Sequence, residues 1–160
     1  MEVKPGYKQT EVGVIPEEWD VQPLGKRAAF RTGPFGSALH KSDYTSNGIP
    51  VVNPMHIIEG KIEPSRSMTI TEQAARNLSD FRMKPSEIVI GRRGDMGRCA
   101  VVQEHQSGWL CGTGSMIIRA QATDSGFFSG FFRVQVPLQP LRSRRLVRRW
   151  SISIKVLWLD

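Results

Sequence analysis

The sequence predicts an α+β fold, a single domain of short, twisted β-strands with a few helices. Two observations support this fold class. Short apolar runs recur along the chain between glycines and prolines, as is typical of short strands, whereas helical apolar spacing is clear in one segment. In addition, 160 residues suffice for one domain with a buried core.

Several segments are expected to form strands because their apolar residues alternate or run continuously: residues 19–24, 49–53, 88–90 and 99–102. Residues 108–118 are expected to hold a pair of strands or one bent strand, since Gly112 and Gly114 permit a bulge or a close approach. Glu59 and Gly60 predict a tight turn. The polar residues 1–10 are expected to fray.

One helix is expected to begin at Thr69. Thr69 and Glu72 have the spacing of a capping box, in which each side chain satisfies a backbone N–H at the start of a helix. Apolar residues at three- and four-residue spacing continue this pattern to Phe81. Pro85 would end the helix.

The positive charge is unevenly placed. The whole chain carries a formal charge of +7. Residues 1–132 contain 15 Lys and Arg against 14 Asp and Glu, whereas residues 133–160 contain 7 against 1. A general electrostatic attraction to DNA would therefore depend on the end of the chain. Any DNA binding by residues 1–132 must come from locally placed arginines.

The composition favours a reduced, cytoplasmic protein without a membrane segment. No apolar run approaches the ~20 residues that span a bilayer, and the first residues lack the apolar stretch of a signal peptide. The cysteines, Cys99 and Cys111, are too few for a disulfide framework and lack metal-ligand spacing. We expect both to be small buried apolar groups.

A turn rich in glycine and arginine follows the apolar strand at 88–90 and contains Gly91, Arg92, Arg93, Gly94, Asp95, Gly97 and Arg98. Glycine lets the backbone adopt positive φ and approach another surface. Arginine offers a planar fork of donors that suits phosphate oxygens or the acceptor edge of guanine. The turn is thus a candidate nucleic-acid contact. The alternative is a hairpin turn whose arginines are simply solvated.

Short motifs occur in a characteristic order along the chain: Ile15-Pro-Glu-Glu-Trp19 with Leu24-Gly25, Gly33-Pro-Phe-Gly-Ser37 with Asp43-Tyr44, Gly48-Ile-Pro-Val-Val-Asn53, Gly60-Lys-Ile62, Lys84-Pro-Ser-Glu-Ile-Val-Ile90, the turn from Gly91 to Arg98, and Gly114-Ser-Met-Ile-Ile-Arg119. In content and spacing they resemble the first target-recognition domain in the specificity subunit of type I restriction-modification enzymes. The resemblance covers about residues 5–132.

This resemblance implies a DNA-binding domain without catalytic activity and without a cofactor. Such a domain reads one half of a bipartite target, and a separate modification subunit methylates adenine. The implied partners are double-stranded DNA and the methyltransferase subunit, with the restriction subunit as a further candidate. The expected organisation is a DNA target-recognition domain over residues 1–132 and a basic tail over residues 133–160.

The candidate DNA face consists of loops, because loops on a fixed scaffold usually carry recognition: residues 33–44, 53–56, 91–98 and 112–115. Arg92, Arg93 and Arg98 are candidates for guanine or phosphate contacts. Asn53 could pair with adenine, and Asp95 could accept from cytosine or orient an arginine. The remaining candidates would position the DNA backbone without reading sequence: Ser37, Lys41, Tyr44 and Ser115.

Each assignment has a structural alternative. Arg98 could form an ion pair with Asp95 inside the turn, Asn53 could cap a turn before Pro54, and Tyr44 could simply pack. A protein-interaction remnant that docks the methyltransferase subunit, with little DNA binding of its own, is the alternative for the whole chain.

The tail at 133–160 departs from the family's pattern, since it has prolines and no helical stripe. One interpretation is a disordered basic arm that grips phosphates. We favour a frameshift, because reading residues 150–160 one nucleotide earlier permits an Asn-Leu-Asn block like the family's. The tail is therefore expected to be aberrant or poorly ordered.

Catalytic chemistry has little support in the sequence. Residues 53–56, Asn-Pro-Met-His, resemble the Asn-Pro-Pro-aromatic motif of adenine methyltransferases but lack its second proline and its aromatic residue. No glycine-rich strand-to-helix turn offers a cofactor site. The candidate carboxylates for a nuclease and the histidines show no grouping for metal binding: Asp80, Glu87, Asp95, His40, His56 and His105. We therefore expect no enzyme and no metal.

Overall fold

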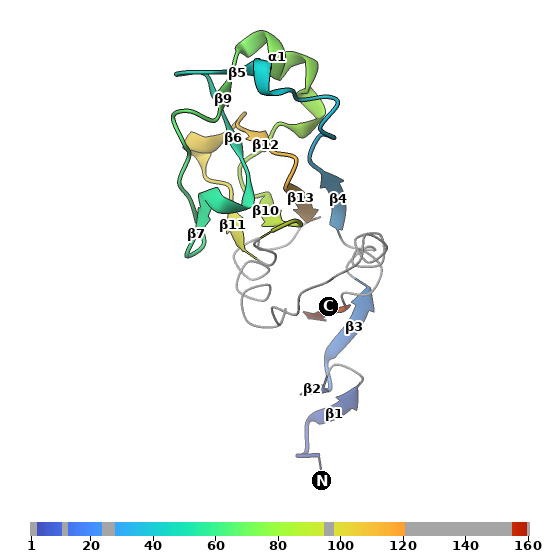
Figure 1. Cartoon of the computed structure of the whole chain (residues 1–160). Helices are drawn as coiled ribbons and strands as arrows, with labels where there is room; N and C mark the ends of the chain where they lie inside the picture. The colour runs from blue at the N-terminus through green and yellow to red at the C-terminus, as the bar shows by residue number, and fades with distance from the viewer. Residues whose placement is uncertain (1–2, 11–12, 24–27, 95–97, 121–154, 160) are drawn as a thin grey trace. The chain divides into compact units, whose positions relative to one another are not determined.

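The computed structural model describes residues 3–10, 13–23, 28–94, 98–120 and 155–159. Its backbone contacts divide the chain into two units. Unit 1 comprises Met1–Ala28 with Arg142–Asp160, and unit 2 comprises Ala29–Leu141. Figure 1 shows the strands of both units. The loops that the sequence singles out all belong to unit 2, so this unit carries the candidate site.

Unit 1 contains two pairs of antiparallel strands. Strand β1 (Tyr7–Thr10) pairs with β2 (Gly13–Pro16), and β3 (Trp19–Pro23) pairs with β14 (Lys155–Leu159). The strand expected at residues 19–24 is therefore present as β3. The expectation that residues 1–10 fray is wrong for β1, because backbone pairing with β2 gives these polar residues a regular partner. Of the tail at 133–160, residues 133–154 and 160 lie outside the described residues.

One sheet of unit 2 has the strand order β11-β10-β13-β4. Its members are β4 (Ala28–Thr32), β10 (Ile88–Gly91), β11 (Cys99–Val101) and β13 (Ser115–Ala120). Strand β10 lies between β11 and β13 and is antiparallel to both. Every residue of β10 is buried, which explains its continuous apolar sequence. The Gly/Arg turn begins where this buried strand ends.

The second sheet of unit 2 has the order β12-β6-β9-β5. It contains β5 (Tyr44–Thr45), β6 (Ile49–Val52), β9 (Thr69–Ile70) and β12 (Leu110–Cys111). Strand β12 runs parallel to β6, whereas β9 is antiparallel to both β5 and β6. The predicted strand at 49–53 is thus confirmed. Residues 108–118 form two strands, one in each sheet.

A small hairpin lies between β6 and β9 in the chain and contacts β11 of the first sheet. Strands β7 (Ile57–Ile58) and β8 (Lys61–Ile62) are antiparallel. The turn between them has Glu59 at φ 48° and Gly60 at φ 79°. Both values lie in the left-handed region that glycine adopts readily. The predicted tight turn is therefore present at these residues.

The helix α1 (Glu72–Asn77) is shorter than the sequence predicts and begins later. Its N-cap is Thr71, whose side chain accepts a hydrogen bond from Ala74 N (3.2 Å). Thr69 instead lies in β9, where its hydroxyl accepts from Gly48 N (2.9 Å) and donates to Thr45 O. A short 3-10 helix, Ser79–Phe81, follows α1. Figure 1 shows α1 next to β5 and β9, toward the end of unit 2 away from β7 and β11.

Three other 3-10 helices occur in the described part of unit 2: Lys41–Asp43, Pro54–His56 and Glu104–Gln106. Two apolar clusters hold the unit together. One contains Ile57, Val89, Ile117 and their neighbours, with Trp109 packed against it. The other contains Val51, Ile70 and Leu110 and lies against Tyr44 and Phe81. The clusters fix the strand ends from which the candidate loops emerge.

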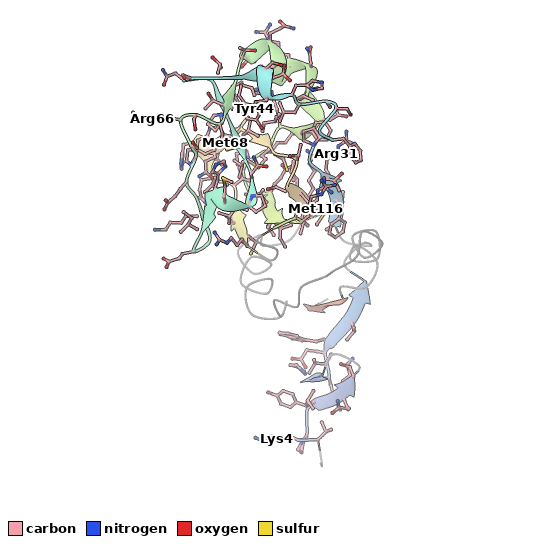
Figure 2. All side chains as sticks on the ribbon, viewed as in Figure 1. Lys4, Arg31, Tyr44, Arg66, Met68 and Met116 are labelled. Atoms are coloured by element: carbon pink, nitrogen blue, oxygen red, sulfur yellow. The ribbon has the colours of Figure 1, made fainter. Side chains whose placement is uncertain are left out.

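Several arginines of unit 2 are used inside the fold. Arg119 pairs with the buried Glu87 (2.6 Å), and Arg82 pairs with Glu72 (2.8 Å). Arg31 pairs with Asp80 (2.6 Å) and lies over the Phe81 ring, 4.8 Å from its centroid. Figure 2 shows Arg31 and Met116 on the same side of the unit. These arginines are bound to internal partners, so other cations must supply any contact with DNA.

Burial of Cys111 makes the stability of the fold depend on pH in the alkaline range. Burial raises the pKa of the Cys111 thiol to about 12 from an ordinary value of 9.0, while the nearby Arg92 opposes the shift. Above pH 9.0 the unfolded chain loses this proton first, so stability falls as pH rises toward 12. We expect the Cys111→Ala variant to lose less stability than wild type between pH 8 and pH 11 when urea unfolding midpoints are compared. Equal losses in both proteins would contradict this assignment.

Candidate nucleic-acid interface

The candidate loops of unit 2 meet at one turn, residues 112–115. Hydrogen bonds join this turn to the other candidate loops: Gly33 N donates to Ser115 O (3.0 Å), Arg92 N donates to Gly114 O (2.9 Å), and Gly114 N donates to Asn53 Oδ1 (3.3 Å). The turn is itself one of the four loops that the sequence proposes as a DNA face, and it contacts parts of the other three. The loops at 33–44 and 91–98 are in contact with the same turn, as a shared surface requires.

Glycine is needed at this turn because the loops approach so closely. A Cβ atom at Gly33 would lie 1.9 Å from Gly112 O, and a Cβ at Gly112 would lie 2.3 Å from Asn53 Oδ1. At Gly114 the nearest atom would be Pro54 Cδ, at 2.9 Å. These separations are far below an ordinary van der Waals contact. The close approach that the sequence predicts at Gly112 and Gly114 is confirmed.

Arg92 lies inside the loop cluster, which consists of the 112–115 turn and the candidate loops that contact it. Its side chain is buried, and Nη2 donates to Thr113 O (2.8 Å), while Nε has no hydrogen-bond partner. Burial lowers the pKa of Arg92, and the neighbouring charge of Arg93 lowers it further. The guanidinium nevertheless stays charged. Arg92 thus holds the 112–115 turn from within, which is a supporting role that the sequence does not reveal.

Arg93 is exposed, in contrast to Arg92. Its backbone N–H donates to Gly114 O (3.2 Å), so the main chain is fixed. Its side chain has no hydrogen bond or ion pair with any part of the chain that the structure describes. The guanidinium is therefore presented to solvent from an ordered backbone. Of the three candidate arginines, Arg93 has the geometry best suited to a DNA contact.

Arg98 contacts a different loop. Its Nη1 donates to Ile57 O (3.4 Å), and the side chain lines a shallow cavity of about 390 Å³ together with Ile58, Gly60 and Cys99. Arg98 therefore borders the β7–β8 hairpin. Asp95 lies outside the described residues, as does its proposed ion pair with Arg98.

Asn53 and Tyr44 have structural partners. Asn53 O accepts from His56 N (2.9 Å) and Asn53 N donates to His56 Nδ1 (3.1 Å), so Asn53 begins the turn before Pro54. Its Oδ1 is occupied by Gly114 N. Tyr44 is half-buried against the second apolar cluster. Burial raises the pKa of Tyr44, Asp43 adds to the rise, and a hydrogen bond with Asn53 opposes it. The geometry supports the capping and packing alternatives for these two residues.

The other candidates differ in exposure. Ser37 and Lys41 are exposed. The sequence assigns Ser115 a contact with the DNA backbone, but its side chain is fully buried and its Oγ has no partner. The reason is its position at the start of β13, where it lies opposite Gly91 of the buried strand β10. Ser115 therefore supports the turn through its backbone rather than through a surface hydroxyl.

The described residues do not suggest a metal centre or a membrane span. Among them, no three His, Cys, Asp or Glu side chains gather closely enough to hold a metal ion. In the same residues, no helix has the length and apolar character needed to cross a membrane. His56 is buried; burial lowers its pKa, and a hydrogen bond with the backbone of Val51 opposes the shift.

Comparison with solved structures shows which known proteins have a similar fold. The HsdS subunit from Thermoanaerobacter tengcongensis matches 92% of this chain with 15% identity and a TM-score of 0.56. The type I restriction-modification S subunit from M. genitalium matches 89% with 17% identity and a TM-score of 0.54. The chain has the fold of a part of these type I S subunits. The resemblance inferred from the motifs and the predicted α+β class are thereby confirmed at the level of fold.

A structure from a study of complex assembly and conformational transition in the type I R-M system gives a TM-score of 0.65 over 89% of the chain, with 13% identity. This chain spans about a third of the length of the solved chains, since it covers 34%, 31% and 35% of them. No family model and no curated protein sequence matches it.

Proposed function

We propose that this chain is a DNA-recognition domain of a type I restriction-modification S subunit and has no catalytic activity of its own. The observation that carries the proposal is the convergence of three candidate loops on the fourth, the 112–115 turn, with Arg93 exposed beside it. The fold that the chain shares with S subunits supports the same role. A rigid loop cluster binds a duplex with little loss of conformational entropy.

The charges suit local contacts rather than a general attraction to DNA. Residues 1–132 carry nearly equal numbers of acidic and basic side chains. Arg93 and Lys41 are nevertheless exposed on the candidate loops, without side-chain partners in the described residues. An exposed arginine can bind a phosphate or the O6 and N7 acceptors of guanine. Lys41 is suited to a phosphate, which would fix the position of the domain on the duplex.

The finer part of the proposal concerns targets and partners. The domain would read one half of a bipartite site in the cytoplasm, and a separate modification subunit would methylate the adenine. A reader of a single half-site lacks the gain in effective concentration that a linked second domain supplies. We therefore expect this chain alone to bind DNA weakly and to bind more tightly when joined to its partner subunits.

The Arg93→Ala variant tests the proposal. Fluorescence anisotropy with labelled random duplexes at about 50 mM and about 200 mM salt should show wild-type binding that weakens with salt. If Arg93 contacts a base, its loss should weaken binding about 5- to 150-fold, since such a contact is worth about 1–3 kcal/mol. If Arg93 binds a phosphate, the slope of log K against log salt should fall by about 1.

Arg66→Ala is the matched control. Arg66 is exposed in the loop between β8 and β9 and has no ion pair with the described residues. Figure 2 shows it on the side of unit 2 away from Arg31, which precedes Gly33 in the chain. Its loss should leave affinity nearly unchanged. Equal effects of the two substitutions, or binding that does not depend on salt, would refute the proposed interface. Turnover of S-adenosylmethionine or cleavage of DNA would refute the non-catalytic assignment.

A further inference from the structure

Unit 2 exposes few large apolar side chains among the residues that the structure describes. Large apolar side chains exposed in the described part of this unit are Phe35 (68%), Met55 (60%) and Ile58 (41%). Phe35 and Met55, which are the most exposed, belong to two of the loops that meet at the 112–115 turn. Exposed apolar side chains on neighbouring loops are candidates for an interaction site.

Phe35 is held by an ordered backbone. Two residues before it, Gly33 is fixed to Ser115 O (3.0 Å). Pro34 is buried. Phe35 O accepts from Ala38 N (2.8 Å), which closes a turn on the other side. The exposed ring is therefore presented from a defined position, and its exposure does not come from a loose loop.

Met55 is held in a similar way by a different loop. It is the central residue of the 3-10 helix Pro54–His56, and both of its neighbours are buried. Pro54 lies against Gly114, where an added Cβ would be only 2.9 Å from Pro54 Cδ. Phe35 and Met55 thus extend from opposite flanking segments of one turn, because Gly33 contacts Gly112 and Pro54 contacts Gly114.

Cations accompany these apolar side chains. The backbone N–H of Arg93 donates to Gly114 O of the same turn (3.2 Å), and Lys41 lies six residues after Phe35; both side chains are exposed and have no partner in the described residues. A ligand that satisfies this surface must combine anionic groups with flat apolar faces. Duplex DNA has this combination in its phosphates and stacked bases, whereas a neutral apolar protein surface would leave both cations unpaired.

We propose that Phe35, assisted by Met55, inserts between neighbouring base pairs of the bound duplex and partly unstacks them. This inference rests on the proposed DNA-recognition function and adds a mode of binding to it. Proteins that insert Phe or Met in this way unstack a base step and bend the duplex. The energy of unstacking depends on the step, so the wedge would contribute to sequence selection without hydrogen bonds to base edges.

The experiment uses 2-aminopurine, a base analogue that fluoresces more strongly when it is unstacked. Duplexes that bind the wild-type chain most tightly are first selected from a random pool, and the analogue is then placed at each position in turn. We expect the fluorescence to rise severalfold at one step when the protein is saturating. Phe35→Ala should abolish most of the rise, and Met55→Ala should reduce it.

Two controls separate the wedge from other effects. Phe35→Leu keeps an apolar side chain able to insert, so it should retain most of the signal. Val14→Ala truncates an exposed apolar side chain of unit 1 and should leave the signal unchanged. Because Phe35 and Met55 are exposed, their truncation should shift the unfolding midpoint little.

The outcomes distinguish this inference from the function on which it rests. Wild-type binding without a fluorescence change at any position would overturn the wedge and leave the DNA-recognition function standing. A change that persists in Phe35→Ala would overturn the assignment to Phe35. Loss of binding to the modification subunit in Phe35→Ala, with DNA fluorescence unaltered, would make this a protein-docking surface instead. Absence of any DNA binding by the wild-type chain would overturn the proposed function itself.

Discussion

The Gly33→Ala variant is expected to lose about 3 kcal/mol of stability or more, at the upper end of overpacking effects. The added Cβ would lie 1.9 Å from Gly112 O and 2.7 Å from Gly112 C. Both obstructing atoms belong to the backbone, so no side chain can rotate away to make room. The hydrogen bond from Gly33 N to Ser115 O must then lengthen or break. Urea unfolding followed by circular dichroism measures the loss.

Two other glycines provide controls for this variant. A Cβ at Gly36 would have no neighbour within 4 Å, so Gly36→Ala should change stability by less than about 1 kcal/mol. A Cβ at Gly48 would lie 2.2 Å from Ile70 O, so Gly48→Ala should destabilise the protein about as strongly as Gly33→Ala. Gly48 lies outside the candidate DNA-binding loops, however. Under conditions where both variants are folded, we therefore expect Gly33→Ala to weaken DNA binding and Gly48→Ala to leave it unchanged. If Gly33→Ala and Gly36→Ala were equally stable, the packing described for this turn would be contradicted.

The Ile117→Ala variant should lose about 2–5 kcal/mol of stability, as expected when a large side chain is truncated in a core. Ile117 is fully buried, lies opposite Val89 in the sheet and belongs to the apolar cluster that includes Cys111. Ile117→Val removes one methylene and should lose about 0.5–1.5 kcal/mol. A urea series on both variants and wild type measures the two losses. If the two substitutions had equal effects, Ile117 would not be at the centre of the core.

The elements that the sequence predicts correctly are those with a local signal. Strands β10 and β11 are buried apolar runs on either side of a glycine-rich turn. The Glu59–Gly60 turn is predicted by its glycine, which readily adopts positive φ. The start of α1 is different, because the chain offers two threonines as N-caps, Thr69 and Thr71. Pairing of β9 with β6 places Thr69 in a strand and leaves Thr71 as the N-cap. The local sequence does not reveal this pairing, because β6 is distant in the chain. The polar strand β1 likewise depends on its partner.

In the candidate site, too, local features could be predicted from the sequence, whereas features that depend on distant contacts could not. The loops could be proposed from their glycines and arginines, but the orientation of each side chain could not. Arg92 and Arg93 are neighbours with the same chemistry, yet one is buried and the other exposed, because the turn at 112–115 covers Arg92. Ser115 is buried for a related reason. Phe35 and Met55 were not among the residues predicted to contact DNA. The sequence feature that could have identified them is a large apolar residue in a loop that has no apolar periodicity.

The central claim is that the 112–115 turn and the three loops that meet at it form one DNA-binding face. Hydrogen–deuterium exchange of the chain with and without a saturating duplex tests it most directly. We predict slower exchange in peptides covering residues 35–41, 53–56, 91–94 and 112–115, and unchanged exchange in the Arg66 loop at 63–68. Protection of the Arg66 loop, with none at these four segments, would contradict the claim.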